Sequence, residues 1–252
     1  PKVLYVDGSK KILDHGVLVM EYLPGHAMDY HTELMLAAPC LADIHSVPIP
    51  ESEEILIHPE NPLKAILEEC EEMFKVYLES PLGDEEKKTY IRELLNLGWK
   101  REAEIRLESG YQCCINTELN STNFLINGEG KTNYLIDWEK PLFGNPAQDL
   151  GHFLAPTTTF WKTDVILTKE EIEKFIDAYI KAVGDRFKTD MIREHTHAFI
   201  PITCLRGITW CAMAWVQYQQ PDKLIFNEST LKKLNAYLDM NFLKNIRTYL
   251  ES

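Results

Sequence analysis

The feature that most restricts the fold of this chain is a pair of short apolar runs joined by a glycine-containing turn. The sequence on either side of them is mostly helical in pattern. The runs are residues 123–127 ("NFLIN") and 133–137 ("NYLID"), and "GEGKT" joins them. Short apolar runs bounded by Asn and Gly predict a β-hairpin. The cross-strand pairs for a turn centred on Gly130 are Asn123 with Asp137, Phe124 with Ile136, and Leu125 with Leu135.

Polar residues gather at the open end of this predicted hairpin. Directly opposed side chains have Cβ atoms about 5 Å apart, so Asn123 and Asp137 converge there. An amide oxygen beside a carboxylate suits Mg²⁺, and Glu118 brings a second carboxylate from the preceding loop. Such a set is typical of phosphoryl transfer. The alternative from the hairpin alone is a surface turn with polar ends, where Asn and Asp are common.

The rest of the chain predicts an α+β fold, in which a small β-containing N-terminal piece precedes a mainly helical body with one central hairpin. Residues 2–7 and 16–23 have the pattern of strands, and residues 47–62 form a proline-rich loop. The predicted helices are residues 29–45, 63–80, 83–109, 147–155, 169–184, 190–219 and 228–249, with Asp84 as the cap of the third. We expect two parts, residues 1–25 and residues 26–252.

Composition narrows the classes of function. The 252 residues carry a net charge of −13 and no basic stripe, which argues against a nucleic-acid partner. Six cysteines without a C-x-x-C pattern indicate reduced thiols, most of them buried, and a cytoplasmic protein. The apolar stretch at residues 198–218 is interrupted by Arg206 and predicts a buried helix, not a membrane span.

Aromatic and histidine residues outside the hairpin have ordinary structural interpretations. The five tryptophans are expected in the core, although Trp161 and Trp215 could also line a pocket for a sugar or a quaternary amine. His45 is expected to pack or to form hydrogen bonds, not to act as a base. The remaining histidines that we considered lack metal-site spacing and are expected to be solvated or to cap helices; they are His26, His31, His195 and His197.

The motifs "NTELNSTN", "LIDWE" and "GNPAQDLGHF" together resemble the catalytic core of the aminoglycoside phosphotransferase and choline kinase-like family, which has a protein-kinase-like fold. The resemblance places the catalytic loop at residues 113–123 and the metal-binding hairpin at 123–139. It implies that Asn123 and Asp137 bind Mg²⁺. It also implies that Glu118 accepts the proton of a substrate hydroxyl and that the buried Asp149 holds the catalytic loop.

The stretch "GVLVMEYLPG" resembles the last strand and the hinge of the family's N-terminal lobe. The resemblance implies that this hinge binds the adenine of ATP, with GTP as another possible donor. The residues concerned are Met20, Glu21, Tyr22 and Leu23. The acceptor implied is a small molecule with a hydroxyl group, such as an aminoglycoside, an amino alcohol or a sugar.

Two positions of the catalytic loop depart from the family pattern: Asn116 stands where the family has His, and Glu118 where it has Asp. Glu adds one methylene, and a displacement of about 1 Å in a reactive site can cost about a hundredfold in rate. Glu118 is therefore a shifted but working base, a base suited to an unusual acceptor, or a mark of lost catalysis. In the last case the chain is a pseudokinase-like binding or scaffold protein.

The N-terminal lobe is incomplete in this sequence. About 15 residues precede the hinge strand, and no glycine-rich phosphate loop or phosphate-pairing lysine stands among them. We expect that the upstream half is absent from this chain or was removed, and that the chain as given binds ATP poorly. The two N-terminal strands would also expose an edge, which favours a homodimer or another partner that covers them.

Overall fold

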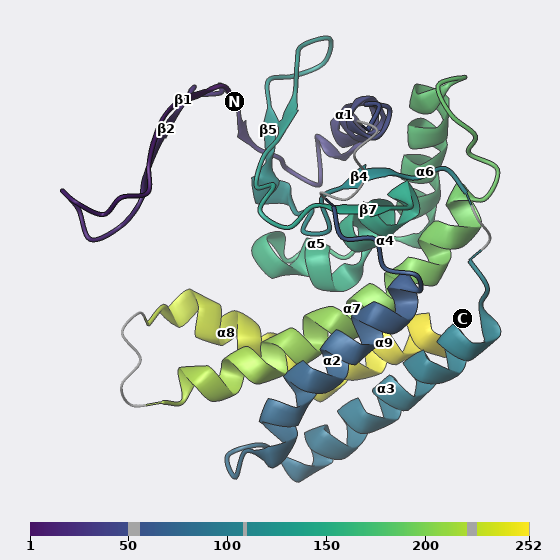
Figure 1. The fold of residues 1–252 in the computed structure, drawn as a ribbon. Helices are drawn as coiled ribbons and strands as arrows, with labels where there is room; N and C mark the ends of the chain where they lie inside the picture. Colours follow the sequence, from purple (N-terminus) through teal and green to yellow (C-terminus); the bar gives the residue numbers. More distant parts are fainter. Residues whose placement is uncertain (50–55, 108–109, 221–225, 252) are drawn as a thin grey trace.

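The computed structural model describes residues 1–49, 56–107, 110–220 and 226–251 (Figure 1). Three small antiparallel sheets lie within residues 3–144, with strand orders β1-β2, β3-β5-β6 and β4-β7. The strands are β1 (Val3–Asp7), β2 (Val17–Met20), β3 (His26–Ala27), β4 (Cys113–Ile115), β5 (Phe124–Ile126), β6 (Tyr134–Leu135) and β7 (Leu142–Gly144).

Helices make up most of the rest of the chain. They are α1 (Leu34–His45), α2 (Pro62–Glu79), α3 (Glu85–Glu104), α4 (Pro146–Leu154), α5 (Pro156–Thr163), α6 (Lys169–Val183), α7 (Ile192–Tyr218), α8 (Glu228–Tyr237) and α9 (Met240–Glu251). The prediction of a small β part followed by a mainly helical body is confirmed. Parts of the predicted loop at 47–62 and of the predicted helix at 83–109 lie outside the described residues.

Helix α7 is the centre of the helical body (Figure 1). It is apolar on every side, and residues along its whole length are buried, as expected for a helix surrounded by other elements. By length and composition it is the one helix among the described residues that could cross a membrane, but 72% of its apolar window is buried inside the protein. The prediction of a buried helix at 198–218 is confirmed.

Proline and aspartate positions explain where the helix predictions were wrong. No helix was predicted between residues 155 and 169, but Pro156 opens α5, because the first turn of a helix tolerates a residue without an N–H group. The predicted helix 228–249 is two helices. It breaks at Asp239, whose carboxylate accepts the backbone N–H of Asn241 at 2.8 Å.

The first helix after the N-terminal strands begins later than residue 29. The carboxylate of Glu33 accepts the backbone N–H of Asp29 at 2.9 Å and contacts His26 Nε2 at 2.8 Å. These bonds hold residues 29–33 as a turn that leads into α1. Asp84 caps α3 as predicted, since its side chain accepts the N–H of Lys87.

The register predicted for the central hairpin is wrong by one residue. Phe124 pairs with Leu135, and Leu125 pairs with Tyr134. The reason is the turn: the N–H of Lys131 donates to the carbonyl of Gly128, so the turn is centred between Glu129 and Gly130 and not on Gly130. The strands are also shorter than predicted, and Asp137 lies beyond the end of β6.

The β1-β2 hairpin stands away from the helical body (Figure 1). Its apolar side chains are largely exposed, with Val6 at 66% and Leu18 at 51% of full exposure. These two strands form a sheet of their own, which contains no other described strand. The predicted homodimer or partner at this edge stays a prediction.

A glycine fixes how closely α4 approaches α7. A Cβ atom at Gly151 would lie 2.4 Å from the Cβ of Phe199, far inside van der Waals contact. We therefore expect Gly151→Ala to push the two helices apart and to lower the free energy of unfolding by about 1–3 kcal/mol. Urea denaturation measures this change.

The control is Gly8→Ala in the exposed N-terminal hairpin, where an added Cβ meets nothing within 4 Å. It should leave the unfolding midpoint almost unchanged. Equal midpoints for the two variants would mean that Gly151 does not set the helix spacing.

Candidate active site

A buried carboxylate organises the loop between β4 and η2 (Ser121–Asn123), a short 3₁₀ turn. Asp149, in the first turn of α4, accepts the backbone N–H of Asn116 at 2.8 Å and that of Thr117 at 2.7 Å. Its side chain is fully buried. These bonds join α4 to the loop that was predicted to be catalytic, and they are the contacts that a support role for Asp149 requires.

His45 closes the other side of the Asp149 carboxylate. Its Nε2 lies 3.1 Å from Asp149 Oδ2, and its Nδ1 lies 2.8 Å from the hydroxyl of Tyr179. Because the Asp149 carboxylate accepts, Nε2 carries the ring proton and Nδ1 accepts from the Tyr179 hydroxyl, which keeps its proton since burial raises its pKa well above the ordinary value. Nε2–H then donates to Asp149. His45 forms hydrogen bonds within the core, as predicted.

The loop carries backbone strain at Thr117, whose φ is +68°. A non-glycine residue in this left-handed region costs on the order of 1 kcal/mol and persists only where its surroundings hold it. Here two adjacent N–H groups point at one buried carboxylate, and that geometry stabilises the turn. The turn determines where the next residue, Glu118, leaves the loop.

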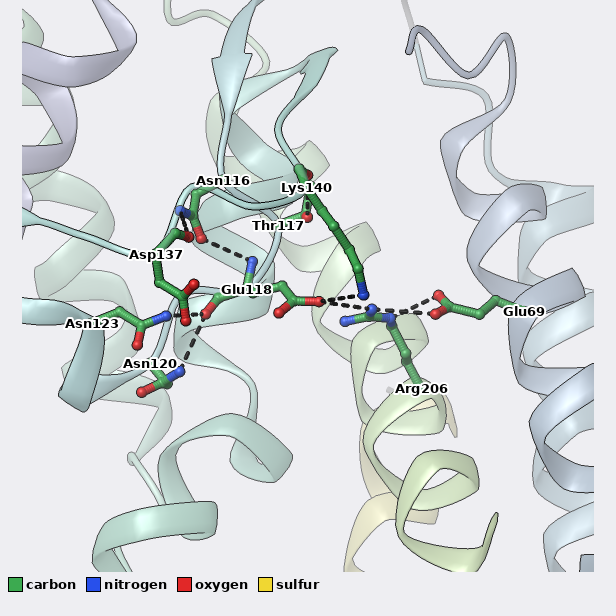
Figure 2. A network of polar contacts seen from close by, with 9 residues as sticks. All are labelled: Glu69, Asn116, Thr117, Glu118, Asn120, Asn123, Asp137, Lys140 and Arg206. Carbon is green, nitrogen blue, oxygen red and sulfur yellow. Dashed lines mark hydrogen bonds and ion pairs between the residues drawn. The ribbon is translucent and has the colours of Figure 1, made fainter. Parts of the chain in front are cut away.

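Asn116, at the position where the resembling family has His, lies inside the loop and is 1% exposed. Its Nδ2 donates to the carbonyl of Asp137 at 2.8 Å, and its Oδ1 accepts the N–H of Glu118 at 3.1 Å. One amide therefore connects the loop to the residue that follows β6. Asn116, which was predicted to be catalytic together with Glu118, therefore lies as a link between Asp137 and Glu118 (Figure 2).

The structure brings the two predicted metal ligands together by another route than direct cross-strand pairing. The N–H of Ile136 donates to the carbonyl of Asn123, and Asp137 then turns back with a φ of +67°. Figure 2 shows the Asp137 carboxylate beside the Asn123 amide. The sequence predicted that Asn123 and Asp137 lie together, but in the wrong register, because it could not foresee the left-handed turn at Asp137.

The donor atoms at this pair suit a hard divalent cation. Asn123 Nδ2 donates to the carbonyl of Glu118 at 3.0 Å, which leaves Asn123 Oδ1 free to bind a metal. The Asp137 carboxylate has no hydrogen bond or ion pair with any residue that the structure describes. No group of three or more His, Cys, Asp or Glu side chains that could hold a metal occurs in the described ranges. Mg²⁺ needs only one or two protein ligands of this kind.

Glu118 points away from the metal-ligand pair, toward two cations (Figure 2). Its Oε1 lies 3.7 Å from Lys140 Nζ and 3.6 Å from Arg206 Nη2. Arg206 also binds Glu69 through Nε and Nη2, at 2.8 and 3.3 Å. Two carboxylates and two cations therefore form one compensated cluster.

Sequence reasoning missed the role of Arg206. The available signal was a single charged residue inside the apolar stretch 198–218, because an arginine on a buried helix needs a carboxylate partner. It gave no indication of which carboxylates these would be. Glu69 comes from α2, and Glu118 comes from the loop after β4.

The four hinge residues predicted to hold a nucleotide lie at the base of the N-terminal hairpin, exposed or half-buried. Tyr22 is 85% exposed and Met20 is 44% exposed. The backbone N–H of Glu21 donates to the carbonyl of Lys2 at 2.8 Å, and binding of a nucleotide at these residues stays a prediction. Leu23 is half-buried.

A cavity of about 250 Å³ opens beside Glu118. Its lining comes from the loop, α4, α5, α7 and α8. The residues are Glu118, Asn120, His152, Thr157, Thr158, Trp161, Thr203, Arg206, Gly207, Trp210, Cys211 and Tyr237.

Of the two tryptophans suggested for a pocket, Trp161 lines the cavity. Trp215 does not, since it packs against Tyr77 and donates to Asn235. Trp210 lines the cavity instead and is 42% exposed, so its expected core position was wrong.

The histidine and cysteine predictions have mixed outcomes. His195 is buried at 1% exposure beside Asn145, so the prediction of a solvated or capping histidine was wrong there. His26 and His197 are exposed and contact Glu33 and Glu173. All six cysteines are free thiols, and five of them are buried, as predicted.

Replacing Asp149 by Asn tests the central support. The asparagine amide has one oxygen acceptor, whereas the two backbone N–H groups of Asn116 and Thr117 now share the two carboxylate oxygens. We therefore expect Asp149→Asn to lower the free energy of unfolding by about 3 kcal/mol. Chemical denaturation measures this loss.

The control is Asp43→Asn, which removes a carboxylate that is 76% exposed and paired with Arg186. A surface pair of this kind contributes at most about 1 kcal/mol. Similar losses in both variants would contradict the role of Asp149.

His152 gives the protein a pH-dependent stability. Burial and then the charge of Arg206 lower the pKa of His152 to about 3, against the opposing effect of Asp149. Between the ordinary histidine pKa of about 6.5 and this value the unfolded chain binds a proton that the folded chain does not. The contribution of neutral His152 is therefore complete above about pH 6.5 and is lost as the pH falls.

We expect the stability difference between the native chain and His152→Gln to change between pH 7 and pH 5, with the native chain losing more. The linkage slope is at most about 1.4 kcal/mol per pH unit, and solvent contact at the cavity wall reduces it. Parallel denaturation curves at both pH values would contradict the shift.

Comparisons with known proteins bear on the family and the fold of this chain. The sequence profile described as "Phosphotransferase enzyme family" matches residues 1–194. A comparison with curated protein sequences gave no match. An ethanolamine kinase from Plasmodium vivax aligns over 98% of this chain and 68% of its own, with 15% identity and a TM-score of 0.63.

Two further solved structures have a similar fold. A choline/ethanolamine kinase family protein from Mesorhizobium loti aligns over 100% of this chain and 79% of its own, with 15% identity and a TM-score of 0.59. A spectinomycin phosphotransferase in complex with ADP and spectinomycin aligns over 94% and 71%, with 15% identity and a TM-score of 0.58. At these identities the matches establish the fold, and the predicted protein-kinase-like fold is confirmed.

Proposed function

The chain belongs to the phosphotransferase enzyme family, and on this premise we propose that it transfers the γ-phosphate of ATP, with Mg²⁺, to a hydroxyl group of a small molecule. The observation that carries the proposal is the placement of Glu118. Glu118 lies on a loop that Asp149 holds, and its carboxylate lines a cavity of about 250 Å³. The backbone carbonyl of Glu118 accepts a hydrogen bond from Asn123, which lies beside Asp137 (Figure 2).

Asn123 and Asp137 are the residues that would hold Mg²⁺. Their free oxygen atoms are hard donors, and one carboxylate with one amide leaves room in the coordination shell for water and phosphate oxygens. The metal would neutralise charge on the transferred phosphoryl group. Asn116 keeps Asp137 in place by donating to its carbonyl.

Glu118 would accept the proton of the acceptor hydroxyl. In the reaction the acceptor oxygen forms a bond to the γ-phosphorus, the bond from that phosphorus to the bridging oxygen breaks, and ADP leaves with the electron pair. Because the transition state is loose, position and charge neutralisation contribute more than strong basicity. A carboxylate held by Arg206 and Lys140 can serve in this way once an acceptor displaces one of these cations.

A second candidate is a pseudokinase-like protein that binds ligands without turnover. Two observations favour it: the Glu118 carboxylate is engaged by two cations, and the hinge residue Tyr22 is exposed. A decayed site has little reason to keep the oxygen donors of Asn123 and Asp137 free, and this supports the enzyme.

Two matched variants separate the candidates. Asp137→Asn removes the metal-binding charge and should abolish Mg²⁺-dependent ATP binding measured by calorimetry. Glu118→Gln should leave binding largely intact and reduce turnover about 10²- to 10⁴-fold, as expected for loss of a general base. ADP release in the presence of acceptors measures turnover.

The outcomes distinguish the assignments. Equal loss of ATP binding in both variants would mean that Glu118 is not the base. Mg²⁺-dependent binding without turnover in the native chain, across a broad set of hydroxyl acceptors, would favour the pseudokinase.

A further inference from the structure

The charge of the cavity beside Glu118 limits what can bind there. Of the residues that line it, Glu118 is the one with a carboxylate and Arg206 is the one with a cationic side chain. Glu118 is already engaged by Arg206 and Lys140, and Arg206 is shared with Glu69. The four charges compensate one another. A cationic ligand therefore gains no unpaired carboxylate and meets the guanidinium of Arg206.

Other groups of the cavity wall are uncharged but polar. Neither ring nitrogen of His152 nor the hydroxyl of Thr158 has a hydrogen bond to any residue in the described part of the chain. The lowered pKa of His152 keeps its ring neutral at physiological pH, with one donor and one acceptor. These groups can exchange hydrogen bonds with hydroxyl groups of a ligand.

Two indole rings form the apolar side of the cavity. Trp161 and Trp210 meet edge to face, with ring centroids 5.2 Å apart and an interplanar angle of 90°. The ammonium of Lys162 lies 5.6 Å from the centroid of Trp161. A ligand cation at Trp161 would therefore face repulsion from Lys162, whereas an apolar C–H face would not.

From these observations we propose that the acceptor is an uncharged polyhydroxy compound, not an amine. Its C–H face would lie against Trp161 and Trp210, its hydroxyl groups would bind His152 and Thr158, and one hydroxyl would face Glu118. The assignment of this ligand as the acceptor rests on the proposed function.

The test measures binding without nucleotide, so that it does not depend on turnover. Matched ligand pairs are glucose with glucosamine, and glycerol with 2-amino-1,3-propanediol, each titrated into the full chain by saturation-transfer NMR. We expect at least one neutral member to bind about tenfold more tightly than its amine. Tighter binding of the amines, or no binding of either class, would overturn the proposal.

Variants connect the result to the cavity. Trp210→Phe should weaken binding of the neutral ligand several-fold, and Trp215→Phe, outside the cavity, should not. Arg206→Gln leaves Glu69 and Glu118 with Lys140 as their remaining cation, so it should move the preference toward the amine by about tenfold. The Glu69→Gln/Arg206→Gln double variant removes both partners of the Arg206–Glu69 ion pair and should keep the neutral preference.

An unchanged preference in Arg206→Gln would also overturn the proposal, because charge compensation would then not set the selectivity. The proposed function has a separate readout, ADP release with ATP and the same neutral ligand. Selective binding without ADP release would contradict phosphotransfer while leaving the ligand class established.

Discussion

The hydrogen bonds at Asp149 are the contacts on which the candidate site depends. A buried carboxylate costs free energy unless it is fully hydrogen-bonded, and here two backbone N–H groups and His45 Nε2 satisfy it. The same bonds impose the left-handed turn at Thr117. Glu118 leaves the loop directly after that turn. The position of the proposed base therefore follows from a residue thirty-one positions later in the sequence, on another element.

A second set of contacts links this loop to the helical body. Arg206 stands on the buried helix α7 and needs carboxylates, which Glu69 of α2 and Glu118 of the loop supply. Electrostatics thus connects the core helix, an outer helix and the catalytic loop. Because the same arginine lines the cavity, the interaction that stabilises the arrangement also determines the charge that a ligand meets.

Local motifs predicted several residues of the candidate site, and contacts between distant segments account for what was missed. The sequence indicated Asn123, Asp137 and Asp149 together, since each has a fixed place in a local motif. It gave the wrong hairpin register, because a turn centred one half-residue away moves every pair. It also missed Trp210 in the cavity, because a tryptophan on an apolar helix has the same pattern whether it faces the core or a ligand.

The unusual Glu118 acquires a physical interpretation from these contacts. Glutamate has one methylene more than aspartate, and in this structure its carboxylate reaches Arg206 and Lys140, on the side of the cavity away from Asp137. An aspartate at this position would be shorter by about 1.5 Å and would bring the carboxylate back toward the loop. The longer side chain therefore reaches the arginine of the cavity, which is its counter-charge.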